Sequence, residues 1–305
     1  MLQQSAKTVM MVRPIQFAFN NETAGNNAFQ NNINSLDAAE INMQATAEFD
    51  AFKNLLETNG VHVLQIQDGV MPVTPDSIFP NNWISVDQHK RMVIYPMYAL
   101  NRRLEKKESI INLLVEKYTI ETQYDYSDYE AKNIFLEGTG SMVIDYVNNI
   151  AYACLSPRTD EGLFLKYCAD MGYKPCCFRA IDAKGMDIYH TNVMMCIGSK
   201  VAVVCLDSVT NACEKKDLIS NLEKTNHTII AISFKQMNNF AGNMLEVQNQ
   251  AATKFLVMSA RAKLSLTASQ IDTIENFNTI LAPDIPTIET VGGGGVRCML
   301  AEIFN

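Results

Sequence analysis

Short polar, turn-rich segments recur along the chain, and each precedes a run of apolar residues. These turn segments lie at 80–83, 136–140, 189–192, 241–243 and 294–298. Measured between Asn82, Glu137, His190, Asn243 and Cys298, the spacings are 55, 53, 53 and 55 residues. A fixed period of this length predicts a repeated structural unit that covers nearly the whole chain.

The same succession of elements is predicted after the turn segments. Apolar runs separated by Asn- and Gly-containing turns indicate pairs of short strands. Amphipathic helices follow them, because apolar residues recur at intervals of three and four. The predicted strand pairs are 83–86 with 92–95, 141–145 with 150–155, and 193–197 with 201–206. The predicted helices are 108–117, 161–171, 215–223 and 269–277, preceded by a longer helix over 37–59 that ends at Gly60. One further period before Asn82 reaches residue 27, which predicts a fifth unit closed by the C-terminal segment.

Turn segments that point toward a common axis would bring Asn82, Glu137, His190, Asn243 and Cys298 together. A cysteine that attacks, a histidine that transfers protons and a carboxylate that orients the histidine form a set sufficient for thiolate catalysis. Each residue also has a structural alternative, since Cys298 could be a buried core residue, His190 a hydrogen-bonded structural residue and Glu137 a loop carboxylate that binds backbone N–H groups. We favour catalysis because Glu137, His190 and Cys298 occupy equivalent positions in the repeat.

The neighbourhood of Cys298 adds to this interpretation. Glycines occupy positions 292–295, and Arg297 directly precedes the cysteine. We expect a flexible backbone there and a cationic environment, which favours the thiolate. Arg297 is therefore a candidate for lowering the pKa of Cys298.

The composition is that of a well-cored globular protein, and we expect a single domain over residues 1–305. Apolar residues make up 48% of the chain and charged residues 19%. The formal net charge of -8 argues against a nucleic-acid partner or an anionic membrane surface. A small amino-acid-like molecule fits better as the partner, and a homo-oligomer is left open.

The same sequence predicts a cytoplasmic protein without membrane spans. The start is too polar for a signal peptide, and no apolar run approaches the ~18 residues that span a bilayer. The eight cysteines are expected to be reduced and mostly buried, with Cys154, Cys196 and Cys205 inside apolar runs. No Cys-x-x-Cys pair is present, so no metal site is expected.

Seven short motifs, in their joint order, resemble those of the penteins, or guanidino-group-modifying enzymes. This superfamily includes arginine deiminase, dimethylarginine hydrolase, succinylarginine dihydrolase and the amidinotransferases, and the chain is most similar to the arginine-deiminase-related or citrulline utilisation hydrolases. The motifs are Met11-Val12-Arg13-Pro14, Asn21-Glu22-Thr23-Ala24, Phe79-Pro80-Asn81-Asn82-Trp83, Leu136-Glu137-Gly138-Thr139-Gly140, Ser156-Pro157-Arg158-Thr159, His190-Thr191-Asn192 and Gly293-Gly294-Gly295-Val296-Arg297-Cys298-Met299.

The resemblance implies an α/β fold, a five-bladed propeller of pseudo-fivefold ββαβ-type repeats with the site on its axis. It implies that Cys298 is the nucleophile, His190 the general acid/base and Glu137 its acidic partner. The implied reaction passes through an S-linked covalent intermediate and needs no metal or organic cofactor.

Two departures from the family pattern bear on the substrate. Many arginine deiminases hold the guanidinium with two Asp carboxylates, where this chain has Asn82 and Asn192. An amide offers one donor and one acceptor, which suits a neutral ureido group. We therefore expect a citrulline-like ureido substrate at least as readily as an arginine-like one, although Glu22 or Asp87 could supply a carboxylate.

Other side chains are candidates for holding the rest of the substrate. Arg13 and Arg158 could bind its α-carboxylate, since a guanidinium matches a carboxylate at two points. Asn82, Asn192 and Asn243 could bond the substrate or stabilise tight turns.

Three other classes of protein are alternatives to this hydrolase. An arginine-type deiminase or an amidinotransferase would differ in substrate or in the group that accepts the carbon unit. A non-catalytic propeller could act as a binding module, because a fold does not fix a function. A papain-like hydrolase needs its cysteine at the start of a long helix, and Cys298 lies only seven residues before the end of the sequence.

Overall fold

The computed structural model describes residues 2–33 and 35–304. Within them the strands form one six-stranded sheet and three sheets of three strands, which do not join into a closed sheet. One small sheet shows the common plan, with β6 (Val143–Asp145), β7 (Ile150–Cys154) and β8 (Lys174–Phe178). Here β6 runs antiparallel to β7, and β7 runs parallel to β8. The parallel third strand is reached through a helix, as parallel pairing requires.

The same three-stranded unit occurs five times in the described chain. Two further copies are separate sheets. One contains β9 (Met195–Ile197), β10 (Val201–Val204) and β11 (Thr228–Ala231). The other contains β12 (Leu245–Gln248), β13 (Lys254–Val257) and β14 (Thr279–Leu281). The six-stranded sheet contains the other two units. One consists of β3 (Ile84–Val86), β4 (Arg91–Ile94) and β5 (Thr122–Asp125), and the other of β15 (Ala301–Ile303), β1 (Thr8–Arg13) and β2 (His62–Gln67). These two are joined where Ile303 of β15 pairs with Val86 of β3.

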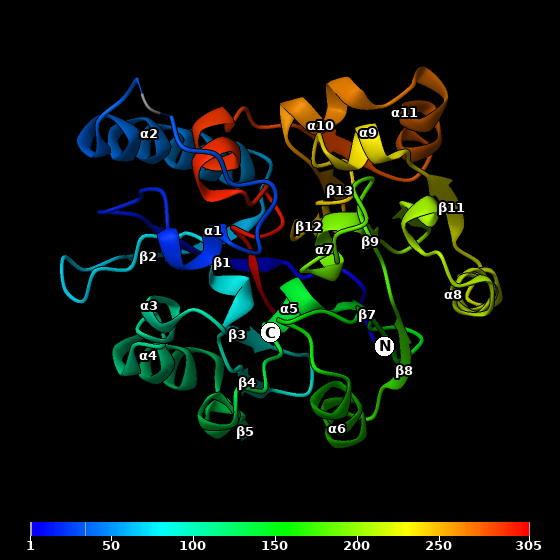
Figure 1. Cartoon of the computed structure of the whole chain (residues 1–305), viewed down its shortest axis with the longest axis horizontal. Coiled ribbons are helices and arrows are strands. Elements are labelled where there is room, and N and C mark those ends of the chain that lie inside the picture. The colour runs from blue at the N-terminus through cyan, green and yellow to red at the C-terminus, as the bar shows by residue number, and fades with distance from the viewer. Residues whose placement is uncertain (1, 34, 305) are drawn as a thin grey trace.

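Five longer helices connect the second and third strands of the units. They are α2 (Ala38–Thr58), α4 (Glu108–Tyr118), α6 (Glu161–Met171), α8 (Ala212–Lys224) and α11 (Ala268–Glu275), which confirms the five predicted helices to within a few residues. Figure 1 shows these helices around the rim, with the strands between them and the centre of the molecule. Reciprocal capping boxes begin α2 at Asp37 and α11 at Thr267.

The shorter helices lie in the connections. They are α1 (Asn21–Ala24), α3 (Leu100–Arg103), α5 (Gly138–Ser141), α7 (Thr191–Met194), α9 (Phe234–Met237) and α10 (Ala260–Ser265). Three 3-10 turns, η1 (Pro80–Asn82), η2 (Ser127–Lys132) and η3 (Leu206–Ser208), and a π-helical turn, η4 (Ile288–Gly292), complete the described elements.

Two sequence predictions need correction. The strands after three of the turn segments begin one or two residues later than predicted, because η1, α5 and α7 each form a single helical turn in front of them. The segment around residue 27 does not lead into a strand either, since it follows β1 and contains α1. The fifth unit instead combines β15 with β1 and β2 from the opposite end of the sequence.

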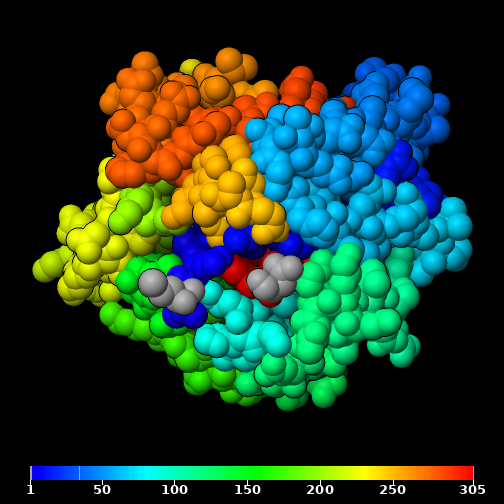
Figure 2. Space-filling view, turned by 180° about the vertical axis from the view of Figure 1, so that it is seen from behind, coloured from blue at the N-terminus to red at the C-terminus, as the bar shows by residue number. Residues whose placement is uncertain are grey.

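The rim helices are held by apolar side chains that pack between helix and sheet. Phe49, Phe52 and Leu56 of α2 are fully buried and belong to one cluster with Val9 of β1 and Val63 of β2. Burying each such large side chain contributes about 1.5–3 kcal/mol. Figure 2 shows the opposite face, where residues near the N-terminus and the C-terminus are both visible at the middle, consistent with the pairing of β1 and β15.

Gly138 cannot be replaced without moving the turn segment before it. Its φ is +48°, and a Cβ there would lie 2.4 Å from the carbonyl oxygen of Asn81. We expect Gly138→Ala to lower the free energy of unfolding by about 3 kcal/mol, from backbone strain and steric overlap together. Chemical denaturation would measure the loss.

Substitutions at two other glycines distinguish the effect of backbone strain from that of steric overlap. Gly172 has a φ of +78°, but a Cβ added to it would meet no atom within 4 Å, and Gly25 has neither a positive φ nor a close neighbour. Gly172→Ala should therefore cost about 1 kcal/mol, and Gly25→Ala close to nothing. Equal losses at Gly138 and Gly172 would contradict the role assigned to the overlap.

Candidate active site

The local fold directs Glu137, His190 and Cys298 toward one region. Glu137 and His190 are the residues that immediately precede the one-turn helices α5 and α7, and neither side chain caps its helix. Cys298 lies between the π-helical turn η4 and β15. The backbone before it packs closely, because a Cβ on Gly295 would lie 2.6 Å from Oδ1 of Asn243.

Glu137 and His190 form a fully enclosed pair. Oε2 of Glu137 lies 2.8 Å from Nε2 of His190, and Oε1 accepts the backbone N–H of Tyr98 at 2.8 Å. Nη1 of Arg158 is 3.5 Å from the same Oε2. The carboxylate is thus held on one side by the backbone and on the other by the imidazole and a guanidinium.

Burial and neighbouring charges set the protonation states of this pair. Burial alone would raise the pKa of Glu137, but Arg158 and His190 outweigh it and lower the pKa to about 2. Burial lowers the pKa of His190 to about 4, although Glu137 acts to raise it. Near pH 7 the pair is therefore a carboxylate and a neutral imidazole. With Nε2–H directed at Glu137, Nδ1 remains available to accept a proton.

Cys298 is buried, and two amide groups approach its sulfur. Nδ2 of Asn243 lies 3.3 Å from Sγ and Nδ2 of Asn192 lies 3.6 Å from it. Asn243 is itself fixed, because its Oδ1 accepts the backbone N–H of Arg297 at 3.0 Å. Asn192 and Asn243 were predicted as substrate ligands, and the structure places both on the candidate nucleophile.

Arg297 acts to lower the pKa of Cys298, as expected, but the surroundings as a whole raise it. Burial raises the pKa of Cys298 above its usual 9.0, and the opposing contributions of Asn243 and Arg297 do not overcome it. The guanidinium of Arg297 donates instead to Oε2 of Glu302 at 2.9 Å and to the carbonyl oxygen of Leu300 at 2.8 Å. Arg297 is therefore engaged in a buried ion pair behind the cysteine.

Cys298 and His190 line a small enclosed space of about 20 Å³, here called the central cavity. Asn82 and Arg158, two of the predicted substrate ligands, line it as well. Five residues that were not predicted as site residues line it too. Thr23, Asn27 and Tyr189 belong to the segments that the sequence pattern singles out, whereas Asp76 and Arg102 lie outside them. Arg13 is not among the lining residues, and it is paired with Asp50 at 2.7 Å.

Asp76 is the carboxylate that lines the central cavity, whereas the sequence analysis named Glu22 and Asp87 as candidates. Glu22 accepts the backbone N–H of Asn101, and Asp87 pairs with Arg91, so neither of the two predicted candidates lines the central cavity. Oδ2 of Asp76 accepts Nδ2–H of Asn20 at 2.7 Å, while its Oδ1 is buried and has no hydrogen-bond partner among the described residues. Burial raises the pKa of Asp76, against the effect of Arg102.

Arg102 and Arg158 are the guanidiniums of the cavity wall, and both are committed to partners. Arg102 donates to both carboxylate oxygens of Glu105, at 2.9 and 3.0 Å, and to Oδ1 of Asn82 at 2.7 Å. The buried Nδ2 of Asn82 has no partner in the described chain. Arg158 donates to Oδ1 of Asn26, and its guanidinium carbon lies 4.9 Å from the ring centre of Tyr189.

The raised pKa of Cys298 predicts how the rate of its alkylation depends on pH. We expect the rate of alkylation by iodoacetamide to keep rising as the pH passes 9.0, because the thiolate fraction is still increasing there. Asn243→Ala should move this profile to higher pH, since it removes the nearer amide donor. Mass spectrometry of the peptide containing residue 298 would give the rate.

The alkylation experiment needs a background without Cys213, which is exposed and would react first. Asn239→Ala serves as the matched amide control, because Asn239 is half-buried, bonds to the carbonyl oxygen of Lys235 and does not line the central cavity. A profile that levels off near pH 7 would show that the thiol is acidic and that burial does not dominate.

Several other expectations concern the cysteines, membrane spans and metals within residues 2–33 and 35–304. All eight cysteines are free thiols, and Cys154, Cys196 and Cys205 are buried as predicted. No helix in this part of the chain is long and apolar enough to cross a membrane. The described His, Cys, Asp and Glu side chains form no group of three that could hold a metal ion.

The repeated three-stranded units form an α/β fold that matches pentein structures. Residues 13–305 match the family described as N,N dimethylarginine dimethylhydrolase, eukaryotic. The chain is therefore a member of that family, which is one of the hydrolase-type pentein families. No curated protein sequence matches it.

Solved structures share the fold at low sequence identity. The N-terminal domain of ArgZ, an arginine dihydrolase from the ornithine-ammonia cycle in cyanobacteria, is 14% identical, with a TM-score of 0.75 over 98% of each chain, and was solved as a Cys-to-Ser mutant bound to substrate. The DDAH of Pseudomonas aeruginosa, a Cys-to-Ser mutant complexed with citrulline, is 16% identical, with a TM-score of 0.65 over 98% of this chain and 99% of that one. At these identities the likeness establishes the fold alone.

Proposed function

We propose that this protein is a cysteine-dependent hydrolase that cuts a C–N bond at the guanidino carbon of an arginine-like molecule. The observation that carries the proposal is the central cavity, where the amide-bound sulfur of Cys298 and the Glu137-bound imidazole of His190 both face the same enclosed space. A thiol and a neutral imidazole that share an enclosed cavity are the parts needed for covalent catalysis.

The proposed reaction begins when the thiol proton of Cys298 passes to Nδ1 of His190. The sulfur then forms a bond to the guanidino carbon, and the C–N bond to the departing nitrogen breaks while His190 returns the proton to it. An S-linked intermediate remains. Water gives a proton to His190 and its hydroxide to the carbon, and the S–C bond breaks as the leaving sulfur takes that proton back from His190. The extra proton of the cationic substrate passes to solvent, and the products are an amine or ammonia and a ureido compound.

The charges around the cavity support a cationic substrate. Arg158 is paired with Glu137, and Arg102 is paired with Glu105 at 2.9 Å and more distantly with Oδ2 of Asp76 at 4.0 Å. Oδ1 of Asp76 has no hydrogen-bond partner among the described residues. A guanidinium could bond this oxygen and would lower the raised pKa of both Asp76 and Cys298. Because a buried carboxylate that is only partly paired costs free energy, a cationic substrate would stabilise the ionised form of Asp76.

A ureido substrate such as citrulline is the second candidate, and a separate observation supports it. The buried Nδ2 of Asn82 and Oδ1 of Asn192 both have no hydrogen-bond partner among the described residues. A ureido group offers an oxygen acceptor for Nδ2 of Asn82, which lines the central cavity, and N–H donors for Oδ1 of Asn192, whose own Nδ2 lies 3.6 Å from Sγ of Cys298. Hydrolysis of citrulline would yield ornithine, CO2 and ammonia.

The test is an assay of the purified protein with L-arginine, N,N-dimethylarginine and citrulline as separate substrates. Citrulline with ammonia or dimethylamine as products would support guanidino hydrolysis, and ornithine from citrulline would support the ureido candidate. Transfer of the amidino carbon to an added amine, without any ureido product, would mean an amidinotransferase. Absence of turnover with all three, in a protein shown to be folded, would contradict the proposal and favour a binding module.

We further propose that the five three-stranded units act as the blades of one propeller and form a single domain over residues 1–305. The support is geometric. The turn segments in front of β3, β6, β9, β12 and β15 carry Asn82, Glu137, His190, Asn243 and Cys298. Side-chain hydrogen bonds join Glu137 with His190 and Asn243 with Cys298, as residues around a common axis require.

A further inference from the structure

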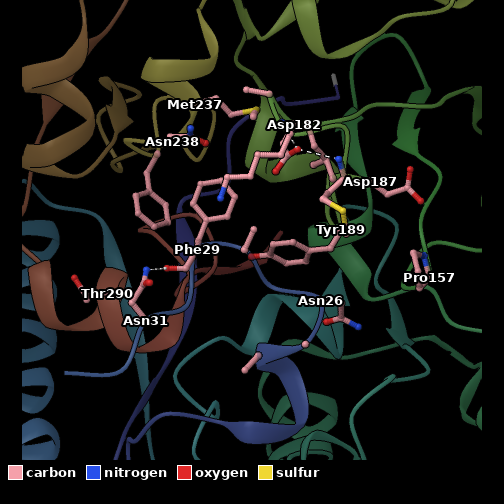
Figure 3. A pocket seen from close by; sticks show the side chains of 18 of the residues that line it. Asn26, Phe29, Asn31, Pro157, Asp182, Asp187, Tyr189, Met237, Asn238 and Thr290 are labelled. Atoms are coloured by element: carbon pink, nitrogen blue, oxygen red, sulfur yellow. Dashed lines mark hydrogen bonds between the residues drawn. The ribbon is translucent and has the colours of Figure 1, made fainter. Parts of the chain in front are cut away.

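A second, larger space lies beside the central cavity. This outer cavity has a volume of about 500 Å³ and is formed by residues from the segments 24–31, 182–189 and 237–240 together with Pro157, Arg261 and Thr290. Figure 3 shows Phe29 and Tyr189 near its middle, with Met237 and Asp182 on one side and Asn26 on the other. Its volume is in the range that buries a molecule considerably larger than a free amino acid.

An aromatic row runs along the outer cavity. The ring of Phe29 lies 6.5 Å from that of Tyr189 and 5.3 Å from that of Phe240. Guanidinium groups stand at both ends of the row, with Arg158 at 4.9 Å from the ring centre of Tyr189 and Arg261 at 5.4 Å from that of Phe240. The row thus offers apolar contact area flanked by positive charge.

The two cavities are separated by a thin partition. Tyr189 lines both of them. Thr23 and Asn27 face the central cavity, whereas Asn26 and Phe29 from the same segment face the outer one. A space of about 20 Å³ holds little more than a water molecule, so a guanidino group can enter only if some of the lining residues move, and Tyr189 with the segment 23–29 is the wall shared with the outer cavity. Movement of this wall joins the two cavities.

Charge indicates what the outer part of a substrate can be. The guanidiniums at the ends of the row do not offer free charge, because Arg158 is paired with Glu137 at 3.5 Å and Arg261 with Glu289 at 3.9 Å. Oδ1 of Asp182 accepts the backbone N–H groups of Lys184 and Met186. The row itself consists of apolar rings, so an apolar group gains more from covering it than a charged one. With the α-carboxylate near Arg158, the α-nitrogen is the position from which an apolar acyl group can extend onto the row.

Resting on the proposed function, we propose that the outer cavity binds the distal end of the substrate, and that the substrate is an arginine-like compound whose α-nitrogen carries an aromatic or bulky apolar acyl group. The guanidino end lies at Cys298 and the α-carboxylate lies at the partition, within reach of Arg158. The acyl group packs on Phe29 and Phe240.

Binding is measured by calorimetry on the Cys298→Ala variant, so the test does not depend on turnover. The probe is Nα-benzoyl-L-arginine, with L-arginine as its unblocked counterpart. We expect the benzoyl compound to bind at least about tenfold more tightly, which is what burial of one aromatic ring provides. Adding Phe29→Ala should remove most of that difference and leave L-arginine within about twofold.

Two further variants test whether the effect of Phe29→Ala is specific to the outer cavity. Phe277→Ala is the matched control, because Phe277 is 43% exposed and lines neither cavity, and it should change nothing. Ala183→Trp fills the outer cavity from an exposed position and should weaken binding of the benzoyl compound alone.

Equal affinities for the two compounds, or losses on Phe29→Ala that are the same for both, would overturn the inference while leaving the proposed function intact. If the benzoyl compound binds as expected but the wild-type protein does not turn it over or any of the three compounds of the substrate assay, the proposed hydrolysis fails and the binding site stands.

Discussion

Replacing Cys298 with alanine is expected to reduce turnover by about 10⁴-fold or more without unfolding the protein. In the proposed reaction the sulfur forms the covalent intermediate, and removal of a nucleophile of this kind costs catalysis on that scale. The substitution removes one buried atom, so the melting temperature should change by only a few degrees. Ammonia and amine release under saturating substrate would measure the turnover.

Cys196→Ala is the matched control for this prediction. Cys196 is also buried, and burial raises the pKa of its thiol to about 12, yet it lines neither the central nor the outer cavity. Its loss should cost some stability and leave turnover near the wild-type value. If the Cys298 variant kept a tenth or more of the wild-type rate, the cysteine would not be the nucleophile.

Glu137→Gln is expected to lower turnover by about 10³-fold or more and to destabilise the fold as well. The amide can still accept the N–H of Tyr98, but it no longer orients His190 as a carboxylate does, and comparable changes in other triads cost about 10⁴-fold. It also leaves Arg158 without its buried counter-charge, which costs about 3–5 kcal/mol. Turnover and denaturant unfolding should be measured on the same preparation.

Glu302→Gln separates the two effects. Glu302 is a buried carboxylate that pairs with Arg297 at 2.9 Å, but it does not line the central cavity. Its substitution should destabilise the protein by a similar amount while turnover of the folded fraction stays within about threefold of wild type. Equal losses of turnover in both variants would mean that Glu137 acts only through stability.

The sequence was informative about the fold wherever one residue pattern dominated. The rim helices could be predicted because each buries a single apolar stripe, as Phe49, Phe52 and Leu56 do in α2. The third strand of each unit carries much weaker signals. In β5, for example, Thr122–Asp125 is short, polar and mostly exposed, so only pairing with β4 defines it as a strand.

The candidate site was predictable to the extent that it follows the repeat. Glu137 and His190 occupy the same position in successive units, and the structure brings their side chains into contact. Asp76 and Arg102 have no such position, because they reach the cavity from connections whose path depends on tertiary packing. Arg13 and Arg297 were chosen for their charge, and the partners that engage them, Asp50 and Glu302, could be recognised only in three dimensions.

The pairing of β1 with β15 has a consequence for how the protein is made. Cys298 lies just before β15, and β15 takes its place only by pairing with β1, whose residues are almost three hundred positions earlier. Contacts of such high sequence separation form late and slowly in folding. During synthesis on a ribosome, the other four units could fold as they emerge, but the sulfur could join His190 only after nearly all 305 residues have been translated. A chain that ends before Cys298 would therefore lack the proposed nucleophile even where it is folded.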